Sequence, residues 1–82
     1  MDNLLQQFVQ TVDEAQLAVI ESQGNGDMER FQHAQNLVLQ AKEQLREVED
    51  SGGTEDLAYI RSKALLRRLE ETQRANEATN KY

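Results

Sequence analysis

The chain contains no cysteine, no proline and no tryptophan, and only one histidine. The absence of cysteine excludes a disulfide-stabilised scaffold, thiolate catalysis and zinc sites built on thiolates. A protein without disulfides suits a reducing compartment, so we expect a cytoplasmic location. His33 has no second histidine or cysteine to pair with and fits no recognised zinc pattern. We therefore expect neither a metal site nor a cofactor.

Long hydrophobic runs are also missing. The mean hydropathy is -0.79, and no apolar stretch is long enough to cross a bilayer. The first ten residues lack both the basic region and the uninterrupted apolar region of a signal peptide. The sequence therefore indicates neither secretion nor contact with a membrane.

Glycine is scarce, and its positions divide the chain. Gly24 with Gly26, and Gly52 with Gly53, separate three stretches of helical composition, because glycine readily adopts the conformation that ends a helix. Residues with capping side chains stand where the helices are expected to begin: Asp2 or Asn3, Asp27 and Thr54. We expect one helical domain over residues 1–82. Its expected helices cover about 3–22, 27–50 and 55–76, followed by a frayed tail over 77–82.

Apolar residues recur within each stretch at steps of three and four, which is typical of one face of a helix. The first stretch has Leu5, Phe8, Val12, Ala15 and Val19, flanked by Leu4, Val9 and Ile20. The second has Phe31, Ala34, Val38, Ala41, Leu45 and Val48. The third is predicted to bury Leu57, Ile60, Ala64, Leu65 and Leu69.

These patterns predict an all-α protein. Short connections favour antiparallel neighbours, so we expect an up-down-up three-helix bundle. The small side chains of Ala15, Ala34 and Ala41 would let the helices approach closely. The spacing also suits an alternative, a helical hairpin that pairs with a second copy in a dimeric coiled-coil bundle.

No constellation of residues indicates catalysis. Carboxylates occur as adjacent pairs, such as Asp13 with Glu14 and Glu70 with Glu71, but adjacent helical side chains point about 100° apart and do not converge on a substrate. The serines follow no strand-to-helix turn of the kind that holds a nucleophile. We therefore expect a protein that is not an enzyme.

Charge is unevenly distributed in this acidic chain. Residues 1–56 hold twelve acidic and three basic side chains, whereas residues 57–82 hold three acidic and six basic ones. The third helix can dock beside an acidic neighbour that neutralises its basic flanks. Alternatively, its arginines form an exposed patch for an acidic protein or for nucleic-acid phosphates. These arginines are Arg61, Arg67, Arg68 and Arg74.

Several leucines lie off the main stripes and are candidates for boundary, core or exposed positions. Three of them, Leu37, Leu39 and Leu66, join the four arginines as the candidate partner-binding residues. We expect a helical protein-interaction or regulatory adaptor module whose partner is another protein. The alternative is a self-associating structural homo-oligomer. Nucleic-acid binding through the third helix is less favoured, because the net charge is -6 and glutamates interrupt the arginines.

Three segments carry a resemblance that spans about residues 4–75. They read LLQQFVQTVDEAQ, FQHAQNLVLQAKEQLREVE and LAYIRSKALLRRLEETQ. The layout resembles small uncharacterised helical proteins of Bacillus-type bacteria, a domain of unknown function. The resemblance implies a compact cytoplasmic helical protein and assigns no catalytic or binding residue. The Gly52-Gly53 turn departs from that layout by shortening the link before the third helix.

Overall fold

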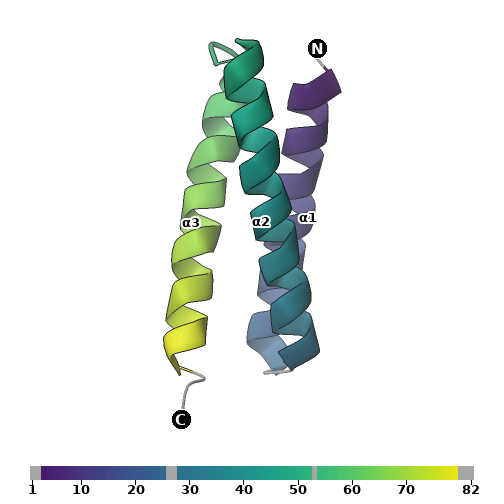
Figure 1. Ribbon diagram of the computed structural model, residues 1–82. Coiled ribbons are helices and arrows are strands. Elements are labelled where there is room, and N and C mark those ends of the chain that lie inside the picture. Colours follow the sequence, from purple (N-terminus) through teal and green to yellow (C-terminus); the bar gives the residue numbers. More distant parts are fainter. Residues whose placement is uncertain (1–2, 26–27, 53, 80–82) are drawn as a thin grey trace.

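Three helices make up the computed structural model, which describes residues 3–25, 28–52 and 54–79. Helix α1 spans Asn3–Asn25, α2 spans Met28–Ser51 and α3 spans Leu57–Thr79. The helices alternate in direction along a bundle with extents of 43 × 17 × 16 Å, and in Figure 1 α1 runs downward, α2 upward and α3 downward. The described residues include no strand. The predicted all-α, antiparallel three-helix bundle is confirmed.

The apolar stripes of α1 and α2 meet inside this bundle. All five residues of the predicted α1 stripe are buried, and α1 packs more extensively against α2 than against α3. In the α2 stripe, Phe31 and Leu45 are half-buried and the other four residues are buried. Both stripes are thus covered within a single chain. The fully enclosed alanines include Ala15, Ala34 and Ala41.

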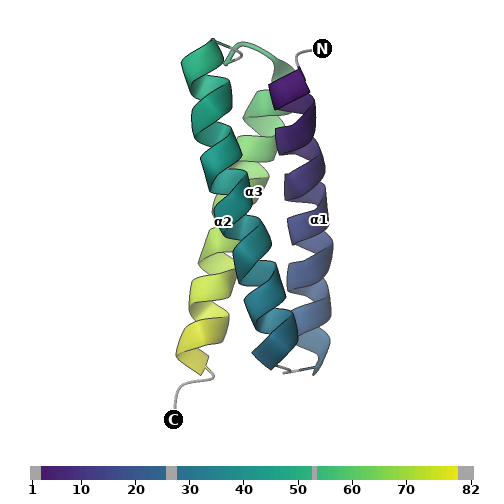
Figure 2. The same ribbon diagram turned by 45° about the vertical axis from the view of Figure 1, so that its right-hand side comes forward.

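Helix α3 presents a different face to the core from the one that the sequence predicted. The prediction was wrong for Leu57, Ile60 and Ala64, which are exposed. The buried face follows steps of three and four through another set of residues: Tyr59, Ser62, Leu66, Leu69 and Gln73. Because Ser62 and Gln73 are polar, this set of residues does not appear in the sequence as a continuous apolar stripe. Helix α3 passes behind α2 in the view of Figure 2, and its first two turns bury Tyr59 while they leave Leu57 and Ile60 exposed.

The helix ends differ from the predicted ones by a few residues. Helix α3 begins at Leu57 instead of residue 55, because Asp56 and not Thr54 caps it: the Asp56 Oδ1 accepts a hydrogen bond of 2.9 Å from the Ala58 N–H. The tail was expected to fray from residue 77, but α3 continues to Thr79. Glu77 and Ala78 are good helix formers and favour this continuation. Residues 80–82 lie outside the described residues, as do Asp2 and Asp27. None of the described helices has the length and apolar character needed to cross a membrane.

The two described glycines should respond in opposite directions to replacement by alanine. Gly24 lies inside α1, with no atom within 4 Å of an added Cβ, whereas Gly52 has a φ of +88°. Gly24→Ala should raise the free energy of unfolding by a few tenths to about 1 kcal/mol. Gly52→Ala should lower it by about 1–2 kcal/mol, since other residues adopt positive φ at a cost. Urea denaturation of both variants checks this, and a loss at Gly24 would show that α1 ends before it.

Candidate protein-interaction surface

The three leucines proposed as partner contacts occupy three different environments. Leu66 is only 2% exposed and belongs to the core, so its assignment to an exposed surface was wrong. Leu37 is half-buried and packs against the core. Leu39 is 48% exposed. Because Leu37 and Leu39 are separated by about 200° around α2, they do not form one patch.

The four candidate arginines of α3 are all exposed. Within the described part of the chain, ion pairs join Lys42 to Glu70 and Lys63 to Glu49, and none involves an arginine. Of the basic residues of α3, only Lys63 forms the expected ion pair with an acidic neighbour in the described chain, and that neighbour is Glu49 of α2. The guanidinium groups of α3 remain available for contacts outside the chain.

The exposed apolar residues of α3 lie among these arginines. Leu57 and Ile60 are 58% and 52% exposed, and Ala64 follows one turn later on the same face. Neighbours on a helix surface are three or four residues apart, so Ala64 is bordered by Ile60 and by three of the arginines. We refer to this surface as the basic α3 patch; it consists of Leu57, Ile60, Arg61, Ala64, Arg67 and Arg68. Sequence reasoning found its arginines but placed its apolar residues in the core.

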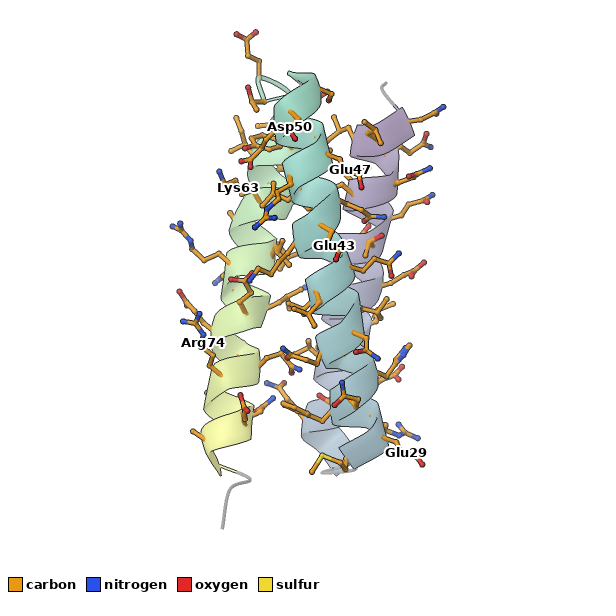
Figure 3. The ribbon with its side chains drawn as sticks, viewed as in Figure 1. Glu29, Glu43, Glu47, Asp50, Lys63 and Arg74 are labelled. Atoms are coloured by element: carbon orange, nitrogen blue, oxygen red, sulfur yellow. The ribbon has the colours of Figure 1, made fainter. Side chains whose placement is uncertain are left out.

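A polar cluster joins α2 to α3 beside this patch. The buried Tyr59 donates a 2.6 Å hydrogen bond to Glu49 Oε2, and the Lys63 ammonium lies 3.0 Å from the same oxygen. Lys63 also donates a 3.2 Å bond to the Tyr59 hydroxyl. Figure 3 shows Lys63 on α3 close to the end of α2 that carries Asp50. The cluster links α2 to the side of α3 that carries Tyr59, and Ile60 on the neighbouring side is exposed.

Protonation of this cluster should be measurable. The hydrogen bonds from Tyr59 and then Lys63 hold the pKa of Glu49 below its ordinary value. A lowered pKa in the folded state stabilises the protein above the unfolded value of about 4.3, and this contribution is lost as pH falls through the folded pKa. Tyr59→Phe should move the pKa of Glu49 back towards its ordinary value. An NMR titration of the side-chain carboxyl carbon measures it, and an unchanged pKa would show that the Tyr59 hydrogen bond is not formed in solution.

A narrow groove of about 170 Å³ runs between α2 and α3. Its walls include Leu39, the Lys42–Glu70 ion pair and Gln73. Gln73 is almost completely buried and donates a 3.2 Å hydrogen bond to Gln35, while its Oε1 has no hydrogen-bond partner among the described residues. The oppositely charged walls neutralise each other, so the groove lacks the uniform charge that would attract an ion.

The outer face of α2 carries a row of acidic side chains. Figure 3 shows Glu43, Glu47 and Asp50 along α2, and their steps of four and three place them on one solvent-facing side. No three metal-ligating side chains come together among the residues that the structure describes. The chain matches no known family model, no curated protein and no solved structure. The resemblance to helical proteins of Bacillus-type bacteria therefore stays a prediction.

Proposed function

We propose that this protein is a non-enzymatic helical interaction module that binds a protein through the basic α3 patch. The observation that supports this proposal is that Leu57, Ile60 and Ala64 form an exposed row among arginines that have no ion pair in the described chain. Burying such a row against a partner removes apolar surface from water, at about 25 cal/mol per Å². The arginines would then select a partner surface that carries acidic side chains beside apolar ones.

A protein partner suits this surface better than nucleic acid does. A nucleic-acid site needs a continuous basic surface and profits from aromatic side chains on which bases stack. The patch instead has aliphatic residues at its centre, Glu71 follows it on the same helix, and Tyr59 points into the bundle. The net charge of -6 further opposes approach to a polyanion.

Site-specific photo-crosslinking tests the proposal. A photoreactive side chain is introduced at Ile60 or Ala64 in cells that express the chain, with Glu47 on the outer face of α2 as the matched control. We expect positions 60 and 64 to form defined crosslinks to protein and position 47 to form none of the same mass. If all three positions give the same products, or none does, α3 is not the binding surface.

A further inference from the structure

Helix α1 carries a second exposed apolar surface that the proposed function leaves unused. Leu17 and Ile20 are 63% and 57% exposed. The helical neighbours of Leu17, three and four residues away, are Ile20 and three exposed carboxylates. None of these carboxylates takes part in an ion pair in the described chain. We refer to this surface as the acidic α1 patch; it consists of Asp13, Glu14, Leu17, Ile20 and Glu21.

The acidic α1 patch is the counterpart of the basic α3 patch. Each surrounds an apolar centre, Leu17 in one and Ala64 in the other, with an isoleucine and three like charges at helical neighbour positions. The charges are three negative in the first patch and three positive in the second. A small alanine opposite a larger leucine would also let two helices approach closely. Both patches are exposed, so they do not cover each other within one chain.

We propose that the partner of the basic α3 patch is the acidic α1 patch of a second copy of this chain. This inference rests on the proposed function and names its partner. The apolar stripes are already covered within each chain, so self-association uses the outer helix faces. Each copy offers one patch of each kind, so a pair of copies can form the contact once, head to tail, or twice, reciprocally about a two-fold axis.

The contact is small, and this determines its strength. The two patches together hold eleven residues, whereas a standard interface uses about 20–30 residues on each side. We therefore expect weak, reversible association, with six charges that are exposed to screening by salt. Raising the salt concentration from about 0.05 to 0.5 M should weaken it about tenfold or more.

Charge reversal and recombination test the inference. Sedimentation equilibrium is measured on the full chain and on two variants with three substitutions each. All the substituted residues are exposed, and circular dichroism confirms that the variants fold. The first variant carries Arg61→Glu, Arg67→Glu and Arg68→Glu. The second carries Asp13→Lys, Glu14→Lys and Glu21→Lys. We expect the wild-type mass to rise above 9.4 kDa with concentration, each variant alone to stay monomeric, and an equimolar mixture of the two to associate again.

A third variant controls for net charge. Glu43→Lys, Glu47→Lys and Asp50→Lys on α2 change the net charge from -6 to 0, as the α1 reversal does, since three reversals add 6. This variant should associate like the wild type. A monomeric wild type at about 1 mM, or association that survives either patch reversal, overturns the inference. In that event the crosslinks from positions 60 and 64 still decide the proposed function, because they report a partner of another mass.

Discussion

Leu66→Ala should lower the free energy of unfolding by about 2–5 kcal/mol, whereas Ile60→Ala should change it by less than about 0.5 kcal/mol. The reason is their burial: Leu66 is 2% exposed and Ile60 is 52% exposed, although they lie within two turns of the same helix. Truncating Leu66 leaves a cavity and removes apolar surface from the core. Truncating Ile60 creates no cavity and removes no apolar surface from the core, and alanine is a better helix former than isoleucine. Thermal melting should show Leu66→Ala about 10 °C or more below the wild type.

This pair also discriminates between the two faces of α3. The stripe predicted from the sequence buries Ile60 and exposes Leu66, so it requires the larger loss at Ile60. Equal losses at both positions would mean that α3 lacks a fixed rotation about its axis. The comparison is made in dilute protein, where association through the basic α3 patch does not add to the stability of the folded state.

Phe8→Ala is the second large effect, with an expected loss of about 3–5 kcal/mol. Phe8 is completely buried and is the largest of the fully buried side chains among the described residues. A domain of 82 residues has a total stability of about 4–12 kcal/mol, so this single change removes a large share of it. We expect the variant to be partly or fully unfolded at 37 °C, as seen by circular dichroism and by the midpoint of urea denaturation.

The chain offers a matched control in its only other phenylalanine. Phe31 is half-buried at the start of α2, so Phe31→Ala makes the same chemical change with less apolar surface to lose. Its destabilisation should be no more than about half that of Phe8→Ala. A larger loss at Phe31 would place the centre of the core at the opposite end of the bundle.

The fold was largely predictable because α1 and α2 repeat large apolar residues at helical spacing with few competitors. Phe8 and Val38 belong to the longest regular apolar series of their helices, and both are buried, whereas the off-series Leu17 and Leu39 are exposed. Helix α3 has two amphipathic faces that share Leu69. Sequence periodicity favours the face with more aliphatic residues, whereas packing selects the one with Tyr59, whose hydroxyl reaches Glu49. That choice depends on a contact between residues ten positions apart, which local spacing does not encode.

The candidate surface was predictable only in its charges. Arginines are rarely buried without partners, so the sequence left two outcomes for them, docking beside an acidic neighbour or an exposed patch, and the structure shows them exposed and without an ion pair in the described chain. The apolar centre of the patch was missed because Ile60 was assigned to the core, and Leu66 was assigned to the surface for the complementary reason. One signal was available: Tyr59, Leu66, Leu69 and Gln73 keep steps of seven, three and four, and the polar Ser62 completes the series.

The exposure of the α3 face can be measured directly, because a chain without cysteine allows one thiol to be introduced at a time. The variants Ile60→Cys and Leu66→Cys are labelled with a thiol reagent in dilute, native conditions. The structure predicts that the thiol of Ile60→Cys reacts at nearly the rate of a free thiol, while that of Leu66→Cys reacts only through unfolding and is slower by orders of magnitude. Slow labelling at position 60 with fast labelling at position 66 would contradict the rotation of α3 and the interaction surface built on it.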